Sequence, residues 1–296
     1  MNLPNRHHYL PVFYLKKWAG GDGRLVRYHR PYDKTVVSRP TPEYTGFEDG
    51  LYSLEGVSAE SRQMIETDFF SLVDNDVAPV MERLVTDGAS RLDSEQRSFW
   101  ARFVMSLQLR SPRSIVEVKS LADWSLREVF DRLDGAKYQA TRKEGEPDSP
   151  YDYAMQQAPE QLANTHKAFL PGLIDHEVIG QHIINMHWEV MDLSGAAHTL
   201  LTADRPYTTS HGLGTPACLL AVPLSPTRLF VAANDVAQFR RLATQKLNDT
   251  VRNMNTLMVK LAIQNVYGCT DDHLAFVEKR LRRASDPWVP CIITRD

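Results

Sequence analysis

Polar and apolar positions alternate in the first fifty residues of the chain, which is the pattern of half-buried β-strands. The alternation is clearest over residues 24–28, pauses at a turn signal at 31–34 and continues at 35–37. This pattern predicts a β-hairpin, which the glycine-rich segment 20–23 introduces. A third short strand is expected at 51–54.

From Ser58 onward the apolar residues recur every three or four positions, which indicates helices with Ser58 as the first N-cap. A capping box at 93–96 predicts the start of a second helix, and Pro112 ends it. Ser111 and Pro112 then predict the N-cap and first position of a third helix, which is expected to end near Leu133. The polar stretch 134–150 predicts a mobile surface loop, and a helical region resumes at 159.

Strand patterns return in the last third of the chain, at 187–193, 198–203, 217–222 and 228–232. Helical patterns follow from 234, over 247–261 and around 271–283. Because strands and helices come in blocks and do not alternate, the order predicts an α+β protein. We expect a single domain over 1–296, in which N-terminal and C-terminal strands build a largely antiparallel sheet. Residues 58–183 would form an inserted helical lobe.

Composition narrows the classes of function. The 296 residues carry a net charge of -3 and are 43% hydrophobic, which excludes a disordered chain and a generally basic nucleic-acid-binding surface. Any binding of a polyanion would therefore need a local basic cluster such as residues 279–283. The sequence shows no signal-peptide pattern, no membrane span and no disulfide or zinc motif among its three cysteines. We therefore expect a cytoplasmic protein that does not contact a membrane.

The most distinctive motif is the N-terminal segment 8–15, His-Tyr-Leu-Pro-Val-Phe-Tyr-Leu. It resembles the opening of a bacterial family catalogued as domain of unknown function 4238, whose members begin with His-Tyr-x-Pro-x-Phe-Tyr-Leu. Shorter elements are similar to that family in the same order along the chain: Gln108, Arg110 and Pro112; Thr202, Asp204 and Pro206; Pro-Leu-Ser-Pro at 223–226; Asn253 and Asn255. The resemblance covers about residues 5–267. It implies the extent of the domain and no activity.

Three residues are candidates for a catalytic site. His8 could act as a general acid or base, or it could pair across strands, while His7 would point to the opposite face. Asp204 follows a predicted strand and could bind a ligand or orient the histidine, although the following Arg-Pro favours a turn-forming role. Arg110 ends a predicted helix and could bind a phosphate, or it could form a structural pair with Glu66 or Asp204.

Three further residues are candidates for substrate binding. Arg113 follows the helix end and could join an anion site, Asn255 lies beside an apolar helix stripe, and Glu66 supplies another carboxylate. The sequence has no His-Glu-x-x-His motif, phosphate-binding loop or nucleophile elbow, so no metal or cofactor is predicted. A divalent ion between Asp204, Glu66 and His8 is an alternative that no spacing rule favours.

Two functional hypotheses remain open. In the first, the chain is a hydrolase or nuclease-like enzyme on a phosphate-containing substrate, with His8, Arg110 and Asp204 in a composite site and a nucleotide or nucleic acid as partner. In the second, it is a non-catalytic binding or protein-interaction module, and the same residues are structural anchors. An open cleft shared by these side chains would favour the enzyme, whereas burial and mutual pairing would favour the second hypothesis.

Overall fold

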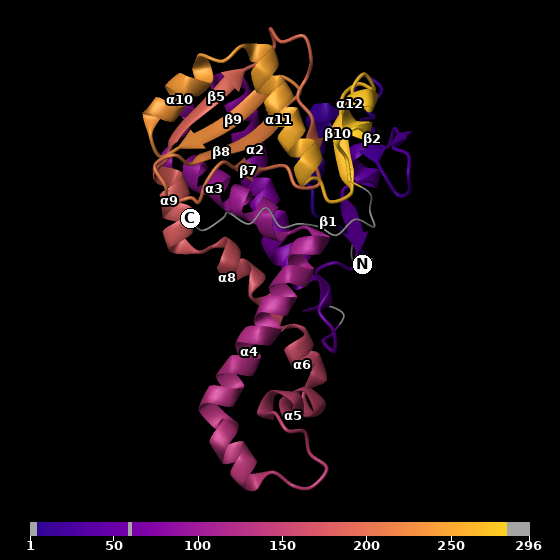
Figure 1. Cartoon of the computed structure of the whole chain (residues 1–296), viewed down its shortest axis with the longest axis vertical. Helices are drawn as coiled ribbons and strands as arrows, with labels where there is room; N and C mark the ends of the chain where they lie inside the picture. Colours follow the sequence, from indigo (N-terminus) through magenta and orange to yellow (C-terminus); the bar gives the residue numbers. More distant parts are fainter. Residues whose placement is uncertain (1–4, 59–60, 283–296) are drawn as a thin grey trace.

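The computed structural model describes residues 5–58 and 61–282, and this part of the chain is an α+β structure with three antiparallel sheets (Figure 1). The first sheet pairs two strands, β1 (Arg6–His8) and β4 (Phe47–Asp49). The second has the order β3 (Val36–Ser38), β2 (Val26–His29), β10 (Asn265–Gly268), β6 (Thr202–Ala203). The third has the order β5 (His187–Asp192), β9 (Arg228–Ala233), β8 (Leu219–Ser225), β7 (Thr208–Thr209).

Helices separate these strands in three groups along the chain. The N-terminal group has α1 (Val12–Leu15), a π-helical turn (Ile65–Phe70), α2 (Ser71–Asp87) and α3 (Ser94–Leu109). The middle group has α4 (Pro112–Thr141), α5 (Pro150–Gln157), α6 (Pro159–Ala163), α7 (Thr165–Ala168), α8 (Leu170–Ile174) and α9 (Glu177–Asn185). The C-terminal group has α10 (Val236–Ala243), α11 (Leu247–Leu261) and α12 (Leu274–Glu278).

The α+β class is confirmed, and N-terminal and C-terminal strands do share a sheet, because β2 pairs with β10. The expectation of one such sheet was wrong, since β5, β9, β8 and β7 form a separate sheet. The reason lies in its two faces. Phe230 contacts Trp100 of α3, with ring centroids 5.2 Å apart, whereas Val231 packs with Met254 and Met258 of α11. A sheet covered by helices on both faces buries both sets of alternating side chains and needs no N-terminal strand to complete it.

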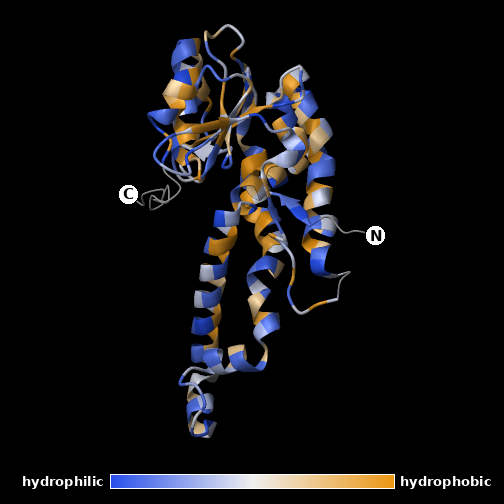
Figure 2. Cartoon of the chain, turned by 90° about the vertical axis from the view of Figure 1, so that its right-hand side faces the viewer, coloured by the Kyte–Doolittle hydropathy of each residue, from blue (hydrophilic) through white to orange (hydrophobic). Residues whose placement is uncertain are grey.

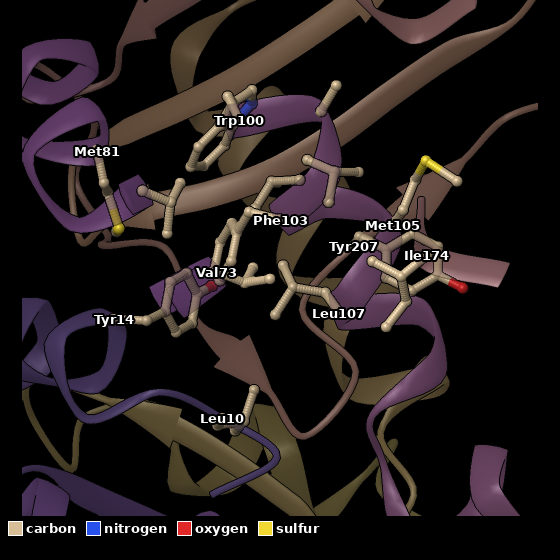
Figure 3. Packing of buried hydrophobic residues seen from close by; sticks show 14 of the residues in the cluster. Leu10, Tyr14, Val73, Met81, Trp100, Phe103, Met105, Leu107, Ile174 and Tyr207 are labelled. Carbon is tan, nitrogen blue, oxygen red and sulfur yellow. The ribbon is translucent and has the colours of Figure 1, made fainter. Parts of the chain in front are cut away.

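The N-terminal motif passes between the helices and the sheets. Leu10 and Tyr14 lie beside α2 and α3, and they belong to the same buried cluster as Trp100 and Phe103 (Figure 3). The Tyr14 hydroxyl donates to the Pro223 carbonyl oxygen at 2.8 Å and lies 2.7 Å from Thr202 Oγ1. This one side chain therefore joins the second sheet to the third.

Helix starts follow the sequence signals closely. The predicted capping box is present at Asp93 and Gln96, and Ser111 caps α4 by accepting from the Ser114 amide at 3.1 Å. Helix α4, however, continues to Thr141, so the loop predicted for 134–150 begins only after that residue. Good helix formers outweigh the single Gly135 in this stretch. Whether the remaining loop is mobile stays a prediction. Helix α4 and the returning α5 and α6 project from the body as an arm (Figure 1), and apolar residues concentrate in the body (Figure 2).

Other boundaries also moved. Residues 51–54 are not a strand; the strand of this region is β4, which ends at Asp49. The strand predicted at 198–203 is limited to Thr202–Ala203. The C-terminal helix is short, Leu274–Glu278, while Arg283 of the basic run and the apolar residues 288–289 lie outside the described residues. No helix in 5–58 or 61–282 is long and apolar enough to cross a membrane. The single domain with its 58–183 lobe stays a prediction.

Replacing Tyr14 with phenylalanine should destabilise the protein by about 1–3 kcal/mol, because the buried Pro223 carbonyl loses its donor and the buried Thr202 hydroxyl loses its hydrogen-bond partner. Urea denaturation of Tyr14→Phe and of the wild type measures the difference in unfolding free energy. Tyr32→Phe is the matched control, since Tyr32 is 81% exposed. An equal stability of both variants would show that the hydroxyl does not hold the sheets together.

Candidate functional site

A buried ion pair lies where α3 ends. Arg110 is 1% exposed, and its guanidinium binds the Asp74 carboxylate of α2 in two-point contact, with Nη1–Oδ1 at 2.7 Å and Nη2–Oδ2 at 3.1 Å. The guanidinium also lies 4.6 Å from the centre of the Phe70 ring. A structural pair with Glu66 or Asp204 was one alternative from the sequence, and the ion-pair partner is instead Asp74. The charge of Arg110 is already neutralised by a carboxylate inside the protein.

The same arginine fixes the N-terminal strand. Its Nη2 donates to the His8 carbonyl oxygen at 3.2 Å, and the Tyr52 hydroxyl donates to the Arg110 carbonyl oxygen. His7 points the other way, as expected for neighbours on a strand. The His7 ring accepts from the Tyr52 amide at 2.8 Å and bonds Gln63 Oε1, so it is an internal anchor. Strand β1 is thus held through the His8 carbonyl oxygen and through the His7 side chain.

Glu66 belongs to this cluster and has an unusual carboxyl group. It lies on the π-helical turn Ile65–Phe70, a geometry that occurs often at functional sites. Burial raises the pKa of Glu66 to about 7, against the opposing effect of the nearby Arg110 charge and with a further increase from Asp74. The His8 amide also bonds this carboxylate. Burial lowers the pKa of the His8 imidazole from its ordinary value, so the ring is neutral at pH 7.

The cluster therefore unites three of the six predicted site residues: His8, Arg110 and Glu66. Each keeps one buried polar atom without a hydrogen-bond partner among the described residues, namely His8 Nε2, Arg110 Nε and Glu66 Oε2. Yet the arrangement is a paired, internal cluster and not an open cleft. By the criterion set from the sequence, it favours structural anchors over a catalytic centre.

Asp204 and Asn255 are tied to main-chain groups elsewhere. Asp204 accepts three amide hydrogens, from Ile263 at 2.7 Å, Gln264 at 2.6 Å and Asn265 at 2.7 Å. Burial raises its pKa to about 6, although the three amide bonds act in the opposite direction. Asn255 accepts from the Leu201 amide at 2.7 Å and donates to the Thr199 carbonyl at 2.8 Å. Both side chains fasten the loops around β6 and β10.

The remaining predicted residue, Arg113, lies on the surface of α4. Its Nε donates to Glu117 Oε1 at 3.1 Å, one helical turn further on. The sequence suggested that Arg110 and Arg113 bind one anion together. In the structure each of them already contacts a carboxylate of the protein, Asp74 for Arg110 and Glu117 for Arg113. Among residues 5–58 and 61–282, no group of three His, Cys, Asp or Glu side chains is placed to hold a metal ion. The divalent ion considered from the sequence stays a prediction.

A cleft of about 330 Å³ opens between the second sheet and the segment that contains β4. Val26 and Tyr28 of β2 face the buried cluster beside α12, so Arg27 and His29 face the opposite way, into this cleft. Strand β10 adds Asn265, which is opposite His29 in the register. The other wall consists of Tyr9, Tyr44, Thr45, Gly46 and Phe47. Thr45 Oγ1 and the Tyr267 hydroxyl, 3.1 Å apart, connect the two walls.

Gly46 is required at this wall. Its φ of +68° lies in the left-handed region, and a Cβ there would come within 3.0 Å of Leu10 Cβ. The chain can therefore turn tightly between Tyr44 and Phe47 only with a glycine. This turn sets the two aromatic residues on the rim of the cleft.

Arg6 and Arg27 lie at the cleft, and neither has a carboxylate within ion-pairing distance in the described part of the chain. Arg30 also lines the cleft, but its guanidinium turns toward the end of α12, where Nη1 donates to the carbonyl oxygens of Glu278 and Leu281 at 3.2 and 3.1 Å. Arg27 donates through Nε to Ser38 Oγ at 3.0 Å. Arg30 binds main-chain carbonyl oxygens, with Nη2 2.8 Å from that of Asp33. Arg6 lies over the rings of Tyr44 and Phe47, 4.9 and 5.0 Å from their centres. The cleft thus has basic side chains and no acidic ones among its lining residues, in a chain whose net charge is -3.

A second hollow, of about 310 Å³ between α3 and α9, differs in this respect. Its Arg102 binds Asp175 in two-point contact, at 2.6 and 2.8 Å. The cation there is neutralised within the protein. Arg27 at the β2 cleft, by contrast, has no carboxylate within ion-pairing distance in the described part of the chain, and its Nε donates to a hydroxyl group.

Sequence reasoning did not identify Asp74, Arg27, His29 or Tyr44. For Arg27 and His29 a signal was present, because polar residues two apart on a predicted strand share one face. For Asp74 there was none, since several acidic residues of the same region could have paired with Arg110. Tyr44 lies on a turn whose geometry depends on the fold.

A family model described as "Protein of unknown function (DUF4238)" matches residues 6–272 of the chain. No curated protein and no solved structure matches the chain significantly. The geometry of the molecule is therefore the main guide to what it does.

Glu66 should make stability depend on pH in a defined window. A carboxyl whose pKa is near 7 in the folded protein and about 4.5 in the unfolded chain binds its proton more tightly when folded. Its contribution to the free energy of unfolding is therefore complete below pH 4.5 and falls as pH rises through 7. Glu66→Gln should match the wild type at pH 4 and exceed it above pH 8 by up to about 3 kcal/mol.

Urea denaturation between pH 4 and pH 9 measures this difference. Glu128→Gln on the exposed surface of α4 is the matched control and should follow the wild type throughout. A constant offset between Glu66→Gln and the wild type at all pH values would contradict the raised pKa.

Proposed function

We propose a function from the geometry of the cleft, because the chain belongs to DUF4238, a family of proteins of unknown function that transfers no activity to it. The proposed function is the non-catalytic binding of a small ligand that carries a phosphate group. The cleft between β2, β10 and the 44–47 turn is the site. Arg27 and His29 are the residues that contact the phosphate.

The observation that carries this proposal is the unpartnered positive charge. A guanidinium group binds a carboxylate or a phosphate in two-point contact, and other arginines of the chain do so, as Arg127 with Asp152 shows. Arg6, Arg27 and Arg30 contact hydroxyl, carbonyl or aromatic groups instead. Because no carboxylate of the described residues lies within ion-pairing distance of Arg6 or Arg27, an anionic ligand in the cleft would gain from both of these charges.

His29 supports the same conclusion. Its Nδ1 is buried and has no hydrogen-bond partner among the described residues. Burial, and next the charge of Arg27, lower the pKa of the ring from its ordinary value, so the imidazole is neutral at pH 7. The ring also bonds the main chain of Val36, which opposes the fall in its pKa. In the tautomer that carries its hydrogen on Nδ1, a neutral imidazole can donate one hydrogen bond to a phosphate oxygen without adding charge. The side chain of Asn265, which is opposite His29 in the register, supplies a further polar group.

The hydrolase hypothesis has less support. Its three catalytic candidates were His8, Arg110 and Asp204, but Arg110 is paired with Asp74 and Asp204 is bonded to three amides. Neither side chain is left to contact a substrate in this arrangement. Hydrolysis or nuclease activity therefore stays a prediction from the sequence, as do the cytoplasmic location and the bacterial origin.

Ribose 5-phosphate is a suitable probe, because it presents one phosphate monoester without an aromatic ring. Isothermal titration calorimetry should show binding to the wild type that weakens with added salt. Arg27→Gln should weaken it at least tenfold, since a charge-assisted hydrogen bond contributes about 1.5–3 kcal/mol. Arg24→Gln removes the same charge from the same hairpin outside the cleft, and it should bind like the wild type.

Two results would refute the proposal. The first is the absence of any binding of ribose 5-phosphate by a folded wild-type protein. The second is an equal loss of affinity in Arg27→Gln and Arg24→Gln, which would show an unspecific effect of net charge.

A further inference from the structure

We infer that the ligand of the cleft is a nucleoside phosphate, whose base stacks on the aromatic wall while its phosphate contacts Arg27 and His29. This inference rests on the proposed phosphate binding and adds the class of molecule. It is carried by the difference between the two walls of the cleft. A bare anion would use only one of them.

The sheet wall and the turn wall offer different chemistry. Strands β2 and β10 present cationic and amide groups, Arg27, His29 and Asn265. The opposite wall presents three aromatic rings, those of Tyr9, Tyr44 and Phe47. Phosphate is recognised by the first kind of group and nucleobases by the second, because every base has a π-face that stacks on an aromatic side chain. A ligand that contacts both walls carries both parts.

The faces of two of these rings are already in use by a cationic group. The Arg6 guanidinium lies over Tyr44 and Phe47, and Arg6 itself is exposed at the surface. Tyr44 is 64% exposed, so its ring remains accessible from the solvent. Guanidinium groups and nucleobases are both planar and stack on the same aromatic surfaces. Arg6 thus shows that these rings stack with planar groups, and a base would take the area of the Tyr44 ring that Arg6 leaves exposed.

The size of the cleft fits one nucleotide unit. Its volume of about 330 Å³ exceeds the space that a single phosphate needs and lies at the lower end of the range of small-molecule sites. The positive charge is also local, because the whole chain has a net charge of -3. A long nucleic-acid footprint would need basic groups spread along the surface. The geometry points to a single nucleotide.

A nucleoside phosphate could come from two sources, a free nucleotide or the 5′-phosphorylated end of a strand. The shared chemistry is one base next to one phosphate monoester. A 5′-phosphorylated tetranucleotide and the corresponding mononucleotide separate the two sources. Stronger binding of the tetranucleotide would identify a strand end, and weaker binding would identify the free nucleotide.

The test compares calorimetric affinities of the wild type for AMP, GMP, CMP, UMP, ribose 5-phosphate and the unphosphorylated nucleosides. At least one nucleotide should bind about tenfold more tightly than ribose 5-phosphate, which corresponds to the stacking of one base. The same nucleotide should bind at least tenfold more tightly than its nucleoside. If all four nucleotides bind no better than ribose 5-phosphate, the inference is wrong while the proposed phosphate binding stands.

Tyr44→Ala isolates the base. This variant should lose the advantage of the nucleotide and keep the affinity for ribose 5-phosphate, because Tyr44 is exposed and its removal leaves the cation wall intact. Tyr32→Ala removes another exposed tyrosine, in the β2–β3 turn and outside the cleft, and should change neither affinity. An unchanged nucleotide affinity in Tyr44→Ala, or an equal loss for both ligands, would overturn the assignment of the base. Failure of ribose 5-phosphate to bind the wild type would instead reject the proposed function itself.

Discussion

The buried pair of Arg110 and Asp74 is the interaction on which the N-terminal half of the structure depends. The two-point contact joins the end of α3 to α2, and the same guanidinium holds the His8 carbonyl of β1. The Tyr52 hydroxyl adds the loop after β4 through the Arg110 carbonyl. Removing either charge would leave the other uncompensated in the interior, which is far more unfavourable than removing both. Four segments are therefore positioned by one ion pair.

This constraint separates the structural charges from those available to a ligand. Arg110, Glu66 and His8 look most like catalytic residues, and they share one buried cluster. Burial is the main cause of the shifted pKa values of Glu66 and His8. Unusual titration alone therefore does not identify a site here. Arg27 and Arg6 have no carboxylate within ion-pairing distance among the described residues. A cation without a carboxylate partner therefore indicates a ligand site better than a shifted pKa does.

The sequence predicted what local chemistry determines. The capping box at Asp93, the Ser111–Pro112 helix start and the strand at 228–232 were confirmed. Other features depend on contacts between distant segments, and no local pattern contains them. The pairing of β2 with β10 joins residues more than 200 positions apart, and the choice of Asp74 for Arg110 follows from how α2 packs on α3. Of the candidate site, the sequence indicated the cluster residues but not the cleft.

The cleft also depends on the register of β2. Tyr28 is opposite Val266, and both lie in the core beside α12, which leaves Arg27 opposite Tyr267 and His29 opposite Asn265 on the other face. A slip of one residue would turn Arg27 and His29 into that core and Tyr28 out of it, at a large cost in buried charge. The hydrophobic side chains that specify the sheet thus also specify which polar groups line the cleft.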